Sequence, residues 1–166
     1  MSTNKRLLVA VDASEASRRA LDYVVEIIGS RPGFHVGLVH LELPPRMIEW
    51  GGSEDAAIEG KVSEERARTY REMEKEALAK GKALLQNMQE YLTERGIHVD
   101  NRMMQFDEPL NPREIARDVL EAARAHDYGT VVVGRHAFSW LKRLVQYHVG
   151  EELVRTGQGV TIWVVE

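Results

Sequence analysis

The chain places a glycine directly after a short apolar run, in the stretch Val131-Val132-Val133-Gly134-Arg135-His136-Ala137. A continuous apolar run of this length is typical of a strand that is buried on both faces of a sheet. Open α/β sheets bind ligands at the carboxyl ends of such strands. A glycine here is expected to supply φ freedom, in a turn or in a phosphate loop. The further glycines that a phosphate loop uses are largely missing, so the stretch indicates a ligand site that is partly lost.

Strand-like runs and helical patterns alternate along the rest of the chain. The expected strands are 7–11, 36–41, 97–104, 130–133 and 160–165. The expected helices begin near Ser14, Ser63 and Asn111, and a last apolar stripe consists of Leu141, Leu144, Val145, His148, Val149 and Leu153. This order predicts a single α/β domain over residues 1–166, a doubly wound parallel sheet with helices on both faces and right-handed crossovers. The polar character of 97–104 predicts an edge strand.

Local signals place the first and third helices. Ser14 is a candidate N-cap, and Asn111-Pro112-Arg113-Glu114 resembles a capping box with proline at the first helical position. Ser17 is expected on the helix surface. The inner stripe of the first helix is expected to contain Ala16, Ala20, Val24, Ile27 and Ile28.

Composition excludes several classes of function. The net charge of −4 argues against a nucleic-acid partner, because no basic stripe replaces phosphate counterions. The chain contains no cysteine, which excludes disulfides and thiolate metal sites. Residues 1–20 carry charges throughout and lack a signal-peptide pattern, and no apolar run is long enough to span a bilayer. We therefore expect a cytoplasmic protein without membrane contact.

Candidate catalytic and metal-binding groups lack a supporting pattern. The six histidines show no His-x-x-x-His or Glu-x-x-His spacing, so no metal site is expected. No serine lies in a nucleophile elbow. We expect a protein without enzymatic activity, although a weak ATPase stays open.

A long loop is expected over residues 43–61, between the second strand and the second helix. It contains two glycines next to Trp50. Loops of this length in compact domains are often functional. Two interpretations of Trp50 remain open: its side chain packs back onto the core, or it marks a surface for a protein partner.

Three parts of the chain resemble the universal stress protein family. They are Leu8-Val9-Ala10-Val11-Asp12-Ala13-Ser14-Glu15-Ala16-Ser17, Val39-His40-Leu41, and the closing motifs Val133-Gly134-Arg135-His136 and Leu141-Lys142-Arg143-Leu144 with Val149, Glu151 and Val154. The likeness covers nearly the whole chain. It implies a Rossmann-like domain with a five-stranded parallel sheet of order 3-2-1-4-5, a homodimer, and often ATP at the carboxyl ends of strands 1 and 4.

The same resemblance locates a candidate nucleotide site. Its positions here are Ala10, Val11, Asp12, Leu41, Val133, Gly134, Ala137, Tyr147, His148 and Val149. In the family, the aspartate contacts adenine, and Gly-x-x-Gly, nine residues, then Gly-Ser or Gly-Thr holds the phosphates. Here Ala137 replaces the second glycine and Tyr147-His148 replace the last pair. We expect weak or no ATP binding and no cofactor. The alternative is ATP with Mg²⁺, held by Arg135, His136, Lys142 and His148 in place of the missing groups.

The last strand is the expected dimer interface. Val160-Thr161-Ile162-Trp163-Val164-Val165 is apolar, and the order implied by the resemblance places it at an edge of the sheet. An open apolar edge without proline or lysine invites pairing with another strand. Antiparallel pairing with a second copy would give a self-complementary interface.

Overall fold

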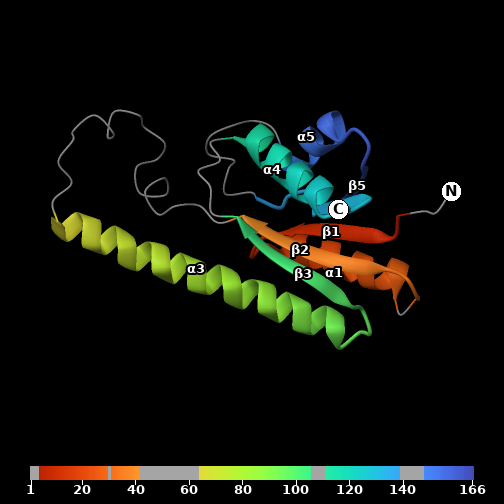
Figure 1. The fold of residues 1–166 in the computed structure, drawn as a ribbon, viewed down its shortest axis with the longest axis horizontal. Coiled ribbons are helices and arrows are strands. Elements are labelled where there is room, and N and C mark those ends of the chain that lie inside the picture. The colour runs from red at the N-terminus through yellow and green to blue at the C-terminus, as the bar shows by residue number, and fades with distance from the viewer. Residues whose placement is uncertain (1–3, 30, 42–63, 106–110, 139–147) are drawn as a thin grey trace.

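The computed structural model describes residues 4–29, 31–41, 64–105, 111–138 and 148–166. The elements in chain order are β1 (Arg6–Val11), α1 (Glu15–Ile28), β2 (His35–Leu41), α3 (Glu64–Thr93), β3 (Val99–Gln105), α4 (Pro112–Ala125), β4 (Thr130–Gly134), α5 (Val149–Thr156) and β5 (Thr161–Val165). Figure 1 shows the sheet between two groups of helices. The predicted loop at 43–61, with Trp50, lies outside the described residues.

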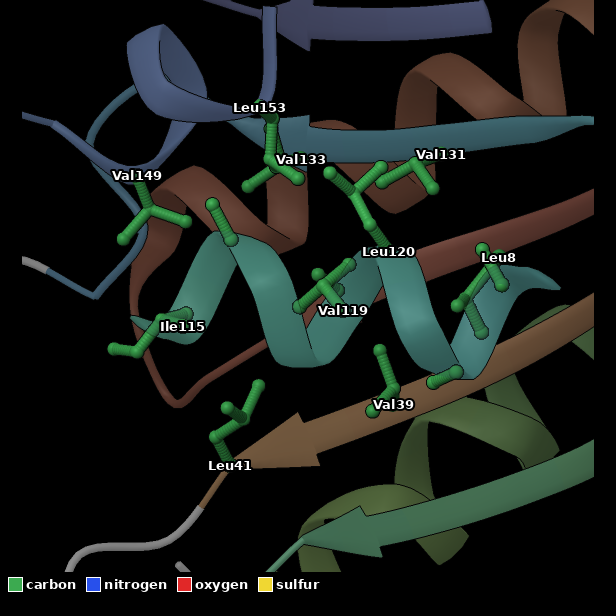
Figure 2. Packing of buried hydrophobic residues seen from close by; sticks show 14 of the residues in the cluster. Leu8, Val39, Leu41, Ile115, Val119, Leu120, Val131, Val133, Val149 and Leu153 are labelled. Atoms are coloured by element: carbon green, nitrogen blue, oxygen red, sulfur yellow. The ribbon is translucent and has the colours of Figure 1, made fainter. Parts of the chain in front are cut away.

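The five strands form one parallel sheet in the order β3-β2-β1-β4-β5. This confirms the predicted fold class and strand order, with β3 at an edge. One buried cluster joins the sheet to α4 and α5, and a second joins it to α1 and α3. Figure 2 shows the first cluster, in which Val119 and Leu120 of α4 lie over the sheet. Burial on both faces explains the continuous apolar runs of β1 and β4.

The predicted caps are present. Ser14 is the N-cap of α1 and its side chain accepts a hydrogen bond from the Ser17 N–H. Asn111 caps α4 in the same way through the Glu114 N–H, with Pro112 at the start of the helix. Both caps satisfy backbone donors that the first helical turn leaves unpaired.

Two helical stripes differ from the prediction. Ile27, which was expected on the buried face of α1, is 36% exposed, and Leu21 lies on that buried face instead. His148 was expected on the apolar stripe of the final helix, but it is the extended N-cap of α5, which begins at Val149. The stripe residues Leu141, Leu144 and Val145 lie outside the described residues. In the part of the chain that the structure describes, no helix is long and apolar enough to cross a membrane.

Candidate functional site

The carboxyl ends of β1 and β4 meet at the centre of the sheet. These strands are parallel neighbours, and Ala10 pairs with Val133 near their ends. The chain leaves β1 toward α1 on one face, whereas the helix that follows β4, α5, packs on the other face. Such a reversal is the switch point at which open α/β sheets bind ligands.

Asp12 follows β1 at this switch point, and protein donors surround its carboxylate. Asp12 is only 5% exposed. Its Oδ1 accepts hydrogen bonds from the Ser14 N–H at 3.1 Å, from the Ser14 hydroxyl and from the Ser17 hydroxyl at 2.7 Å. Its Oδ2 accepts a hydrogen bond from the Phe138 N–H at 2.6 Å. The carboxylate therefore ties the turn after β1 to the loop after β4.

Ser17 is a site residue that the sequence prediction missed. It was expected on the surface of α1, yet it is fully buried. Its hydroxyl donates to Asp12 Oδ1 and accepts from the Asp12 N–H at 2.9 Å. The physical reason is its position in the first turn of α1, three residues after the N-cap, where a side chain can reach back to the preceding turn. That spacing from Ser14 was the available signal.

Gly134 ends β4 and is needed for a reason that the sequence did not indicate. Among the described residues, the glycines with positive φ are Gly29, Gly33, Gly96 and Gly159, so Gly134 does not use a left-handed conformation. A Cβ at Gly134 would lie 2.5 Å from the carbonyl carbon of Ala16 and would overlap its oxygen. The expectation of φ freedom is wrong. The glycine allows the backbone of α1 to approach the end of β4 closely.

An apolar wall lies beside the carboxylate. The predicted site residues Ala10, Leu41, Val133, Ala137 and Val149 are all buried in one cluster. Figure 2 shows Leu41 and Val149 at the same end of this cluster as Ile115. Val11 instead packs in the cluster on the opposite face, and its carbonyl oxygen lies 2.8 Å from Nδ1 of the buried His40.

Phe138 is the second residue that the sequence prediction missed. It belongs to the same apolar cluster, is 2% exposed, and has the largest of the fully buried side chains in the described ranges. Its backbone lies in the left-handed region, with φ of 60°. No periodic pattern could have found it, because it lies in a turn directly after Ala137.

Only some of the side chains that were expected to hold phosphate in place of the missing glycines lie in the described residues. The Arg135 side chain forms an ion pair with the Glu166 carboxylate. The backbone N–H of Arg135 donates to the Val165 carbonyl at 2.7 Å. The rings of His136 and His148 meet edge to face, with centroids 5.4 Å apart. Tyr147 and Lys142 lie outside the described residues. Within the described ranges, no group of three or more His, Asp or Glu side chains could hold a metal ion.

A model of the universal stress protein family matches residues 3–159 of the chain. The chain belongs to this family. The match extends from β1 to the turn before β5 and therefore includes the whole described site. No curated protein sequence matches the chain.

Solved structures of universal stress proteins share the fold. A family member from Burkholderia pseudomallei is 21% identical with a TM-score of 0.60, over 99% of this chain and 98% of that one. UspA from Lactobacillus plantarum is 12% identical with a TM-score of 0.67, over 100% of both chains. The Archaeoglobus fulgidus protein, solved in complex with dAMP, is 17% identical with a TM-score of 0.58, over 99% of this chain and 100% of that one. At these identities the likeness establishes the fold alone.

Proposed function

We propose that this universal stress protein is cytoplasmic and acts by binding and regulation as a homodimer, without catalysis, and that its affinity for ATP is weak or lost. Support for the binding role comes from the switch-point location of the candidate site. Support for the homodimer comes from the open edge of β5. Each part of the proposal has its own test.

The internal use of the Asp12 carboxylate is the observation that carries the loss of ATP affinity. Hydrogen bonds from Ser14, Ser17 and Phe138 already engage both oxygens. Oδ1 already accepts three hydrogen bonds, so an adenine amino group could bond only to Oδ2, which it would share with the Phe138 N–H. Furthermore, Ala137 stands where relatives with a complete motif have glycine, and its Cβ limits the approach of an anion to the backbone. Losing two charge-assisted phosphate contacts, at ~1.5–3 kcal/mol each, weakens binding a hundredfold or more.

Calorimetric titration of the purified protein with ATP and Mg²⁺ tests this proposal. We expect binding at least about a hundredfold weaker than in a combined variant, Ala137→Gly, Tyr147→Gly and His148→Ser, which restores the phosphate motif. Chemical analysis of the purified wild-type protein should find no retained nucleotide. Tight ATP binding by the wild type, or no gain in the combined variant, would contradict the proposal.

The contact between His136 and His148 favours a second candidate function, an ATP-binding protein in which cations replace the missing glycines. Two imidazoles 5.4 Å apart at the end of β4 could both face a phosphate group. The ion pair of Arg135 with Glu166 weakens this candidate, because the arginine already has a carboxylate partner. If it is correct, the wild type binds ATP, and replacing both histidines by alanine abolishes that binding.

The dimer proposal rests on the surface around β5, which is an edge strand. In the described part of the chain, the large hydrophobic side chains that are exposed are Tyr23, Ile27, Val154 and Val164. All lie on β5 itself or on the two helices that contact it, α1 and α5. The ring of Tyr23 packs edge to face on Trp163, with centroids 6.0 Å apart. Apolar side chains thus line both faces of the open edge, where a partner strand would pair.

Light scattering of lysine variants tests the dimer. Val154→Lys and Val164→Lys change side chains that are 62% and 38% exposed, so the fold should survive while the dimer dissociates. Ile162→Lys and Trp163→Lys should give a monomer or an insoluble chain, because these side chains are half-buried. The control is Gln86→Lys, an exposed change on α3. A standard interface buries ~1,600 Å² in total. A monomeric wild type at micromolar concentration would rule out this assembly.

A further inference from the structure

We propose that Phe138 is a built-in substitute for a nucleobase: its ring fills the apolar half of the switch-point crevice, and a purine base enters only when Phe138 leaves. The choice of a purine rests on the proposed function, because the family resemblance places a base at Asp12. The placement of Phe138 is independent of that choice. It rests on the burial of the ring and on the bond from the Phe138 N–H to Asp12.

Phe138 lies beside the position where this fold binds ligands, because its N–H bonds to Asp12 at the end of β1. Its N–H reaches Asp12 from the opposite side of the β1–β4 boundary. Its ring lies in the cluster that contains Leu41 and Val149, which come from the carboxyl end of β2 and the start of α5. The crevice that an open α/β sheet leaves at its switch point is therefore filled by the chain itself.

Phe138 also offers the two chemical features that a bound aminopurine would offer. A purine base is a flat aromatic ring that bears N–H donors at its edge. Phe138 places an aromatic ring in the apolar cluster and donates its N–H to Asp12 Oδ2 at 2.6 Å. The surrounding groups are suited to this pair of features, because an apolar wall accepts a flat ring and a carboxylate accepts an N–H donor. The same surroundings would thus accept an aminopurine base in place of Phe138.

The backbone of Phe138 lies in an unfavourable conformation. A φ of 60° is rare for a bulky side chain. The residue is held there by ring burial and by the bond to the carboxylate, both of which a purine could replace. A purine that supplies both interactions would release this strain. In the wild type, Phe138 competes with the purine. The apparent association constant for the purine is therefore the intrinsic constant multiplied by the fraction of molecules in which the crevice is open.

Removing the ring should reveal the purine site. Phe138→Gly keeps the left-handed conformation available and removes the ring. Calorimetric titration with adenosine, which lacks phosphates, is expected to show binding about tenfold tighter or more than in the wild type. Leu120→Ala is the matched control, since it opens space in the same cluster beside Val131, away from Leu41 and Val149 (Figure 2). This control should gain no adenosine affinity.

A second variant and a second probe keep the test decisive. If Phe138→Gly does not fold, Phe138→Leu retains an apolar side chain, and its affinity for adenosine should still exceed that of the wild type. Binding of benzene but not adenosine by a folded variant, or equal adenosine affinity in all proteins, would overturn the inference. The proposed function fails separately: tight ATP binding by the wild type would contradict it, even if the loss of the ring still raised the adenosine affinity.

Discussion

Two aspartates connect strands at opposite ends of the sheet, and they differ in the donors that they use. Asp12, at the carboxyl end, accepts bonds from the backbone N–H groups of Ser14 and Phe138, one at each carboxylate oxygen. Asp100, at the amino end of β3, is bonded only through side chains among the described contacts: Nη2 of Arg6 lies 2.9 Å from its Oδ2, and the Tyr128 hydroxyl donates to its Oδ1 at 2.8 Å. Backbone donors are fixed in position, whereas side-chain donors can rotate.

Two glycines repeat this difference. A Cβ at Gly134, at the carboxyl end, would lie 2.5 Å from the carbonyl carbon of Ala16, which is backbone. A Cβ at Gly37 in β2 would lie 2.5 Å from Cζ of Tyr128, which is part of a side chain. At the carboxyl end, the main-chain groups of Ser14, Phe138 and Ala16 make contacts that cannot adjust independently of the fold, and the serine hydroxyls add to them. At the amino end, the corresponding contacts of Asp100 and Gly37 are made by the side chains of Arg6 and Tyr128. Changes at the candidate site should thus cost more than equivalent changes at the other end of the sheet.

The glycine pair gives the largest expected effect. Gly134→Ala should lower the free energy of unfolding by about 3 kcal/mol, because the backbone of α1 has to move. Gly37→Ala should cost about 1–2 kcal/mol, since the buried Tyr128 side chain can shift, at the expense of its bond to Asp100, while the backbone stays in place. Urea unfolding of the two variants measures both values. Equal losses would show that the Ala16 backbone gives way as readily as a tyrosine ring.

The aspartate pair gives the next effect. In Asp12→Asn the amide has one acceptor oxygen, but backbone donors approach both carboxylate oxygens, so one N–H loses its partner at a cost of about 1–3 kcal/mol. In Asp100→Asn the amide oxygen can still accept from Tyr128. The remaining loss is the ion pair with Arg6, about 1 kcal/mol or less, because the Arg6 side chain is 37% exposed. Urea unfolding should rank Asp12→Asn as the less stable variant, and the reverse order would break the comparison.

Most of the fold could be read from the sequence, whereas the contacts within the site could not. The apolar runs of β1 and β4 and the caps Ser14 and Asn111 are local signals, and the structure has all of them. Gly134 was recognised for the wrong reason, because its neighbour Ala16 is distant in sequence. Ser17 was missed because its buried hydroxyl is bonded to Asp12, and a hydrophobic pattern carries no record of such bonds. Phe138 was missed because it lies in the turn after β4, where no periodic pattern applies.

The smallest expected effect is a pH dependence that comes from Tyr128 at the amino end. Burial, and then the bond to Asp100, raise the pKa of Tyr128 to about 12. The unfolded chain holds the proton with a pKa near 10. Below pH 10 both states keep the proton, and the Tyr128 bond contributes about 1 kcal/mol. Between pH 10 and about 12 the unfolded state releases the proton first, so this contribution is lost as the pH rises.

Tyr128→Phe should therefore be less stable than the wild type at pH 8, and the difference should shrink as the pH rises above 10. Tyr91→Phe is a necessary companion, since the bond to Asp22 also raises the pKa of Tyr91. Asp12→Asn, altered at the other end, should follow the wild-type slope throughout. Urea unfolding between pH 8 and 11.5, about 1.5 units above the ordinary tyrosine pKa, measures these slopes. A constant difference between wild type and Tyr128→Phe would show that the amino-end network does not hold the tyrosine proton.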